Sequence, residues 1–212
     1  MKRALLLLCP LACLFSCQQV SPPEDMLQAG DRLERETRNK QVARTFEEFT
    51  ASPRYAFSRD IWCGRALELT DPQHSRVEIL LSVQRGRLYI RDKIAMDFPI
   101  CSGRVGGSET PTGSFRISEK KLEHRSSLYG SFVDAQDRVV KGGADSRRHK
   151  APAGAHFKGA LMPYWMRFNG AVGLHVGTVL RDGDSHGCVR VPPEACSILY
   201  SKLAVGSAVI VK

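Results

Sequence analysis

The segment from residue 175 to residue 192, HVGTVLRDGDSHGCVRVP, gathers the side chains of this chain that are best suited to chemistry. It places His175, His186, Cys188 and Arg190 among glycines. Two histidines and a cysteine could bind zinc, but His-x-Cys is not a common zinc spacing, and neither a CxxC pair nor an HExxH motif accompanies it. We therefore expect no metal ion and no cofactor at this segment.

A cysteine nucleophile makes use of more of this segment than a metal site does. A free thiol has a pKa of about 8.5, and an imidazole that accepts its proton stabilises the thiolate, so we expect a lowered pKa for Cys188. Gly183 and Gly187 have no side chain, so backbone N–H groups could closely approach a developing oxyanion. Arg190 would share the side of Cys188 at a strand end, where it suits a substrate carboxylate or bonds loop carbonyls as a structural arginine.

The elements that position this segment are predicted to be short strands. RVEILLSV, RLYI and KIAMDFPICSG are apolar or alternating runs separated by turns. TPTGSFRIS continues the sheet, and the chain closes with a short helix, PEACSILYSKL, and a strand, GSAVIVK. The basic, glycine-rich residues 137–159 lack periodicity and predict a long surface loop. We expect residues 71–212 to form a mainly β domain, a sandwich-like mixed sheet with short helices.

The N-terminal residues have the features of an export signal. Two basic residues precede the run ALLLLCPLACLF, which is too short to span a bilayer, so residues 1–16 predict a secretory signal peptide. LFSC resembles a bacterial lipoprotein signal in which Cys17 is diacylated, with a plain cleaved signal as the alternative. Residues 17–70 are predicted to be a tether and helical spacer, with one or two helices within 24–50. These features place the protein in the cell envelope, in the periplasm and held to a membrane by lipid.

Charge and cysteine content narrow the class of protein further. The chain has 212 residues and a net charge of +9, which suits an anionic partner such as an acidic wall polymer or lipid. Export argues against nucleic acid as that partner. Cys63, Cys101, Cys188 and Cys196 remain in the predicted folded part, too few for a disulfide framework. A disulfide between Cys188 and Cys196 remains an alternative to a nucleophile.

Three motifs together carry a family resemblance. SHGCVR preceded by a histidine, TPTGSF upstream and MPYWMRF just before it resemble the L,D-transpeptidase catalytic domain (YkuD family) over residues 74–212. The resemblance implies a β-sandwich-like mixed sheet and chemistry on peptidoglycan stem peptides. A cysteine attacks the bond between the diamino acid and the terminal D-alanine of a tetrapeptide, forms a thioester and passes the acyl group to an amine. The product is a 3→3 cross-link; other members attach a wall lipoprotein, exchange a D-amino acid, or use water as L,D-carboxypeptidases.

The resemblance also assigns roles residue by residue. Cys188 matches the nucleophile and His175 the general base, with the imidazole oriented by the carbonyl of Val176, a position where many members have glycine. The remaining matches surround the oxyanion and the substrate: Ser185, His186, Gly187, Arg190, Tyr164 and Trp165. For Tyr164 and Trp165, core packing is the alternative. The alternatives for the whole protein are a catalytically silent wall-binding protein and a general exported cysteine peptidase.

Overall fold

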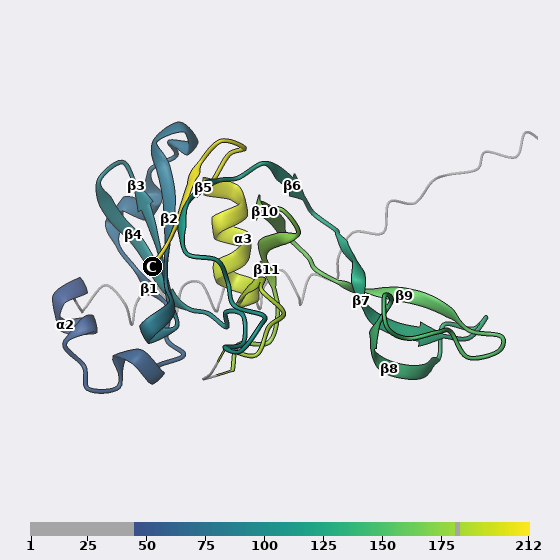
Figure 1. Ribbon diagram of the computed structural model, residues 1–212. Helices are drawn as coiled ribbons and strands as arrows, with labels where there is room; N and C mark the ends of the chain where they lie inside the picture. The colour runs from purple at the N-terminus through teal and green to yellow at the C-terminus, as the bar shows by residue number, and fades with distance from the viewer. Residues whose placement is uncertain (1–44, 181–182) are drawn as a thin grey trace, which may run out of the picture. The chain divides into compact units, whose positions relative to one another are not determined.

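The computed structural model describes residues 45–180 and 183–212, which belong to one compact unit spanning residues 41–212. The predicted signal peptide, Cys17 and most of the predicted helical region 24–50 lie outside the described residues. The described part is mainly β, with three sheets and few short helices, as the sequence predicts (Figure 1).

The largest sheet has six strands and carries most of the alternating runs recognised in the sequence. Its order is β1-β4-β3-β2-β13-β5, with bounds Trp62–Cys63, Lys93–Pro99, Arg85–Ile90, Ser75–Leu80, Ala208–Val211 and Gly113–Arg116. β2 alternates strictly between buried and half-buried residues, the period of a strand with one face on the core. The C-terminal strand β13 inserts between β2, to which it is parallel, and β5, to which it is antiparallel.

The second sheet has four strands and holds the segment rich in reactive side chains. Its order is β12-β11-β10-β6, with bounds Val189–Val191, Val172–Val176, Trp165–Asn169 and Glu119–Lys121. Helix α3 (Pro193–Lys202) follows β12 directly and begins with proline at its first turn, where a missing N–H costs nothing. Its buried residues, Ala195, Cys196 and Leu199, join the hydrophobic core between the sheets (Figure 1).

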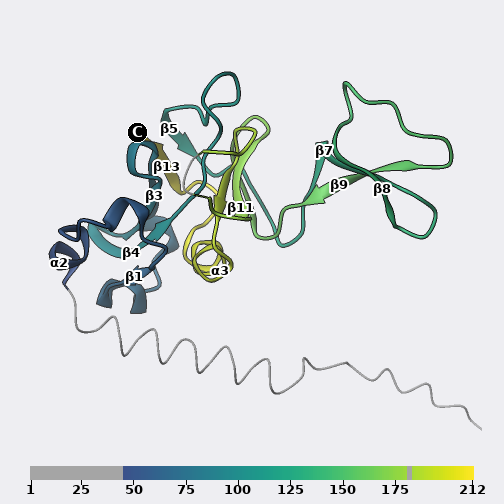
Figure 2. The same ribbon diagram turned by 90° about the horizontal axis from the view of Figure 1, so that it is seen from below.

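The third sheet corrects the prediction of a long loop at residues 137–159. β8 (Val139–Asp145) and β9 (His156–Leu161) pair on either side of β7 (Arg125–Val133), and this sheet projects away from the other two (Figures 1 and 2). Most β8 residues are exposed, so its sequence has no buried side to produce alternation. The close approach of β9 to β7 requires glycine at residue 159, because a Cβ there would lie 1.9 Å from the Ser126 carbonyl oxygen.

The structure also corrects the predicted boundary at residue 71. β1 pairs with β4, so the chain before residue 71 is already part of the large sheet. Helix α2 (Phe46–Thr50) is the described part of the predicted spacer helix, and it begins with a capping box between Thr45 and Glu48. Its Phe49 is buried. Residues 45–70 therefore pack on the domain and do not form a free tether.

A buried ion pair fixes this N-terminal segment to the sheet. Arg85 and Asp97 are both fully buried, and the Nη2 of Arg85 lies 2.7 Å from Oδ1 of Asp97. The same guanidinium donates to the carbonyls of Ser58 and Asp60, at 2.7 and 2.9 Å. The Tyr55 hydroxyl donates to Oδ2 of Asp97 at 2.7 Å. Asp97 is therefore the carboxylate through which residues 55–60 and two strands are joined.

We expect Asp97→Asn to destabilise the protein by about 3–5 kcal/mol, because it leaves the buried Arg85 guanidinium without its counter-charge. The measurement is the free energy of unfolding in urea. Asp92→Asn is the matched control, since the Asp92 side chain is fully exposed and its one ion pair, with Arg76, is 3.6 Å long. Equal stabilities of the two variants would contradict the structural role of the buried pair.

Candidate active site

The parallel pairing of β11 and β12 brings the two ends of the reactive segment together. Its register places Leu174 beside Val189 and His175 beside Arg190. Extending the register by one residue places Gly173 beside Cys188, which precedes β12. Side chains two residues apart share one face of a strand, so His175, Cys188 and Arg190 lie on the same face of this sheet. The pairing of β11 with β12 thus brings His175 and Cys188, which are 13 positions apart in the sequence, onto one face.

Cys188 contacts two backbone polar groups of the segment that leads into and forms β11. Its sulfur is 3.7 Å from the Ala171 carbonyl oxygen, to which the thiol donates, and it accepts a hydrogen bond from the Gly173 N–H. Burial raises the pKa of Cys188, and the Gly173 N–H and the charges of Arg190 and Arg167 oppose this only in part. The resting sulfur is therefore a protonated thiol near neutral pH.

His175 is buried and held in one tautomer. Its Nδ1 lies 2.8 Å from the Val176 carbonyl oxygen, so the hydrogen bond expected from the sequence is present. Because a carbonyl only accepts, Nδ1 carries a proton and Nε2 is left as the basic nitrogen. Burial lowers the pKa of His175 to about 4, with Arg190 and His124 adding repulsion and the Val176 carbonyl opposing. Above that pH, Nε2 is free to accept a proton.

The directions of these two pKa shifts correct the expectation of a lowered pKa for Cys188. A resting thiolate–imidazolium pair needs a thiol pKa below that of the imidazole, and the shifts run in the opposite directions. Within the described part of the chain, no hydrogen bond joins the His175 ring to the Cys188 sulfur. The arrangement is instead suited to proton transfer during attack on a bound electrophile.

The loop before Cys188 is fastened by a residue whose role the sequence analysis missed. Gly187 has a φ of +108°, a conformation that favours glycine. The buried Thr110 hydroxyl donates to the Gly187 carbonyl at 2.8 Å and accepts from the Gly103 N–H at 2.8 Å. Ser185 is buried beside the same segment, and its N–H donates to the Ser102 carbonyl at 3.0 Å. The signal for Thr110 is its place in the TPTGSF motif, which the sequence analysis uses for turn, strand and family resemblance without giving Thr110 a role.

Arg190 and His186 face a groove beside the nucleophile. The stem of Arg190 covers Gly177, where an added Cβ would lie 2.8 Å from its Cγ. Its guanidinium lies 3.5 Å from the Asp184 carbonyl and 4.0 Å from the carboxylate, so the structural role left open by the sequence is present in part. His186 is exposed and stacks on Tyr129 of β7, with ring centroids 4.1 Å apart. His186 therefore connects the catalytic loop to the projecting sheet.

Trp165 lies in the core, the half-buried Tyr164 packs against the core, and neither residue lines the groove. Trp165 is fully buried, so it cannot contact a substrate in this structure, and that prediction is wrong. It packs 6.1 Å from the His175 ring and stacks on His124 at 4.5 Å. The Tyr164 ring packs edge-on against Tyr200 of α3, at 5.5 Å. The core-packing alternative therefore describes both residues, and Trp165 is a support for His175.

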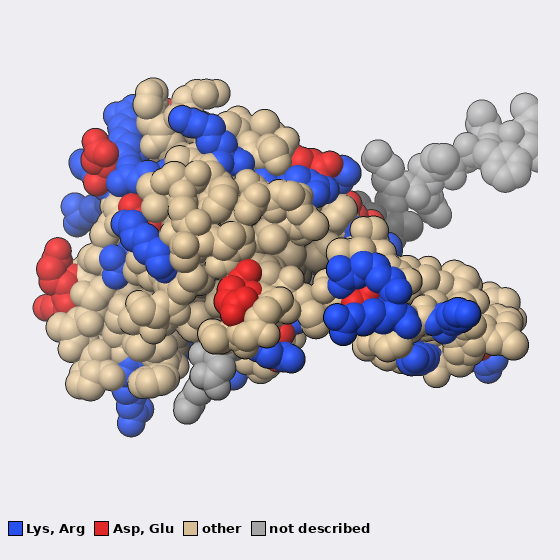
Figure 3. Space-filling view, in the orientation of Figure 1, with Lys and Arg blue, Asp and Glu red and all other residues tan. Residues whose placement is uncertain are grey.

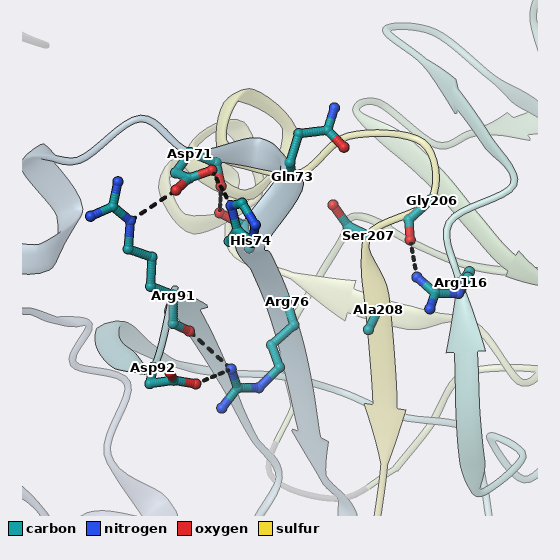
Figure 4. A pocket seen from close by; sticks show the side chains of 11 residues that line it. Asp71, Gln73, His74, Arg76, Arg91, Asp92, Arg116, Gly206, Ser207 and Ala208 are labelled. Atoms are coloured by element: carbon teal, nitrogen blue, oxygen red, sulfur yellow. Dashed lines mark hydrogen bonds and ion pairs between the residues drawn. The ribbon is translucent and has the colours of Figure 1, made fainter.

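A hollow of about 530 Å³ lies at the N-terminal end of β2, and most of its charges pair among themselves: Asp71 with His74 and Arg91, and Arg76 with Asp92 (Figure 4). Its remaining cation, Arg116, donates to the Gly206 carbonyl at 2.8 Å. The hollow contains no cysteine.

In residues 45–180 and 183–212, no cluster of three His, Cys, Asp or Glu side chains could hold a metal ion. The alternative disulfide is not formed, since Cys188 and Cys196 are both free thiols.

A match to a family model shows the family of this chain. Residues 75–211 match the YkuD family, the L,D-transpeptidase catalytic domain. Similar solved structures include L,D-transpeptidases from Stackebrandtia nassauensis (TM-score 0.48, 22% identity, 68% of this chain and 58% of that one) and Mycobacterium smegmatis (0.49, 14%, 66% and 58%). L,D-transpeptidase 1 from Mycobacterium tuberculosis has a TM-score of 0.45 and 16% sequence identity, and the match covers 66% of this chain and 61% of that one. The chain thus spans less than two thirds of these proteins. No curated protein sequence matches it.

Proposed function

Because the chain belongs to the L,D-transpeptidase (YkuD) catalytic-domain family, we propose that it is an active acyltransferase that uses Cys188 to cut and rejoin peptidoglycan stem peptides. The observation that carries this proposal is the β11–β12 register, which sets His175 and Cys188 on one face. A protein that only binds the wall does not need an oriented imidazole beside a thiol. The donor is a stem tetrapeptide, and the acceptor is an amine on a second stem or on a wall-attached lipoprotein.

The proposed first half-reaction removes D-alanine. The Cys188 sulfur attacks the carbonyl carbon of the diamino acid while Nε2 of His175 accepts the thiol proton. Backbone N–H groups beside Gly187 stabilise the oxyanion, and collapse breaks the C–N bond as the imidazolium returns the proton to the leaving amine. A thioester on Cys188 and free D-alanine result. Arg190, on the same face, is placed to hold a substrate carboxylate.

The second half-reaction reverses these roles. An acceptor amine attacks the thioester carbonyl and gives its proton to Nε2 of His175, the C–S bond breaks, and the sulfur recovers the proton. Water in place of the amine gives hydrolysis, which is the L,D-carboxypeptidase alternative. Both outcomes use the same Cys188 thioester, so they differ only in the acceptor.

Incubation of the protein with tetrapeptide muropeptides, followed by mass analysis, tests the proposal. We expect a dimer that has lost one D-alanine. A tripeptide with no dimer would assign carboxypeptidase activity, and unchanged tetrapeptide would support the silent wall-binding alternative. Adding a free D-amino acid or an amine-bearing lipoprotein peptide to the same incubation identifies the preferred acceptor.

Thr110→Val should lower the rate of Cys188 acylation by roughly 10²-fold, the effect expected of a displacement of about 1 Å at a reacting group. The change leaves the Gly187 carbonyl and the Gly103 N–H without their shared hydroxyl. Single-turnover acylation kinetics measure the effect. Thr110→Ser keeps the hydroxyl and is the matched control. If the valine and serine variants acylate at the same rate, Thr110 does not position the loop.

We also propose that the protein is a lipoprotein of the cell envelope, diacylated on Cys17. Two acyl chains hold a protein stably to a membrane, whereas one chain is marginal. Cys17→Ser should therefore release the protein from the membrane fraction, as followed by fractionation and immunoblotting. Membrane retention of that variant after a salt wash would contradict lipidation and would point to the predicted helical region 24–50, or to the basic segment 137–159, as the tether.

A further inference from the structure

A groove of about 950 Å³ runs along the projecting sheet and reaches the candidate active site. One wall is the β7–β8–β9 sheet, and the lining also includes Gly107 and Ser108 of the loop before β5. His186 and Arg190 line it as well, whereas Cys188 and His175 do not. A bound chain that occupies this groove would therefore pass beside the nucleophile.

Two contacts hold the groove wall against the catalytic loop. Tyr129 of β7 stacks on His186, two residues before Cys188. The Tyr129 hydroxyl accepts a hydrogen bond from Arg147 at 3.0 Å, and Arg147 also pairs with Asp145 at 2.8 Å. The groove and the active site are thus joined through side-chain contacts, and what binds along the sheet shares a surface with the reacting groups.

The charge of the groove is positive and only partly compensated. Four basic residues of the sheet and of the segment after β8 line the groove: Arg125, Arg147, Arg148 and Lys158. Its two acidic residues each form an ion pair with one of them, Asp145 with Arg147 and Asp137 with Lys158 at 2.9 Å. Basic side chains gather on this sheet in the space-filling view (Figure 3). The groove therefore has more cations than the acids within it can neutralise.

Arg125 and Arg148 are the two cations left over. Arg125 is exposed and donates to the Gly159 carbonyl at 3.0 Å, and within the described residues no carboxylate pairs with it. The Arg148 side chain is 81% exposed and lies 3.9 Å from a carboxylate that Arg147 already holds. At the active-site end, Arg190 shares Asp184 with Arg104, which binds it more closely. Three guanidinium groups along one groove are thus available to a ligand.

We propose that this groove selects stem peptides that carry free carboxylates, through Arg125 and Arg148, over stems whose carboxylates are amidated. The inference rests on the proposed function and adds a substrate preference to it. A guanidinium forms two parallel hydrogen bonds to a carboxylate, while a neutral carboxamide offers one acceptor oxygen and no charge. An exposed ion pair changes affinity by up to about five-fold, so the carboxylate form should bind about five-fold more tightly, and less so at high salt.

Two synthetic tetrapeptides test this preference. They differ at one group, a free carboxylate or a carboxamide on the residue before the diamino acid, and calorimetry gives both dissociation constants. The full chain carries Cys188→Ala, so that neither peptide is consumed. In that background, Arg125→Gln with Arg148→Gln should reduce the affinity ratio to about one. Lys141→Gln with Lys150→Gln is the matched control, since both lysines are exposed on or beside β8 and neither lines the groove.

The outcomes separate this inference from the proposed function. A ratio near one in the parent protein, no measurable binding of either peptide, or an equal loss of preference in both double variants would overturn the inference. Turnover of both peptides by the Cys188 protein would still support the proposed function. Carboxylate-dependent binding that is lost only in the arginine variant, without turnover, would support the groove and contradict the enzyme.

Discussion

Cys188→Ala is expected to abolish both turnover and covalent labelling by a carbapenem. The sulfur of Cys188 is the atom that forms the acyl bond in the proposed mechanism, and loss of a catalytic nucleophile lowers turnover by on the order of 10⁶-fold. The family resemblance implies that a carbapenem acylates the same sulfur through its strained lactam carbonyl. Intact-protein mass spectrometry should therefore show one adduct on the parent protein and none on the variant.

A matched cysteine controls for nonspecific labelling. Cys63 is a half-buried free thiol in β1, and burial raises its pKa to about 11. Cys63→Ala should retain the adduct and the turnover of the parent protein. An adduct of the same mass on Cys188→Ala would assign the nucleophile to another side chain and would overturn the proposed mechanism.

His175→Ala is expected to lower the acylation rate by about 10²–10⁴-fold, the usual contribution of a general base. The pKa of His175 is lowered to about 4, so Nε2 is unprotonated above that pH. In the parent protein, kcat/KM should therefore stay level from near-neutral pH down to about pH 5 and fall about ten-fold per unit below pH 4. The variant has no base to protonate, so its residual rate should lack this acidic limb.

His186→Ala separates a base from a supporting residue. His186 stacks on Tyr129 and is exposed, so its removal should loosen the groove and raise KM while the acidic limb stays in place. The comparison uses the pH profiles of kcat/KM for both variants beside the parent. If the limb disappears only in His186→Ala, the assignment of the base to His175 is wrong.

Local patterns predict the strands whose side chains pack on the core, from one face in β2 and from both faces in β4. The alternation in β2 and the apolar run of β4 follow directly from residues that pack on the core. β8 and β9 were missed because their side chains are largely exposed and only backbone pairing to β7 reveals them. The sequence predicts a tether and spacer at residues 17–70. It does not reveal that residues 55–60 contact Arg85 and Asp97, because these partners lie 25 to 42 residues further along the chain.

The sequence predicts part of the candidate site, but it does not predict the electrostatics of the site. SHGC and an upstream histidine predicted the Cys188 and His175 pairing, since motif chemistry depends on residue type and order. The direction of both pKa shifts depends on burial in the folded protein, and the types of the neighbouring residues in the sequence do not determine burial. Trp165 is buried in the core and does not line the groove, which the sequence motif does not reveal. The sequence also does not predict the Tyr129–His186 stack, because the two residues are 57 positions apart in the chain.

The neutral resting state of Cys188 has a consequence for how long the protein survives in an oxidising environment. Peroxides and disulfides react with thiolates, and an exposed low-pKa cysteine is the kind that becomes sulfenic acid or a mixed disulfide. Burial keeps Cys188 protonated, and the Ala171 carbonyl holds the thiol hydrogen. A sulfur that gives its proton to His175 only while it attacks a correctly bound acyl donor is protected from oxidants before the substrate binds.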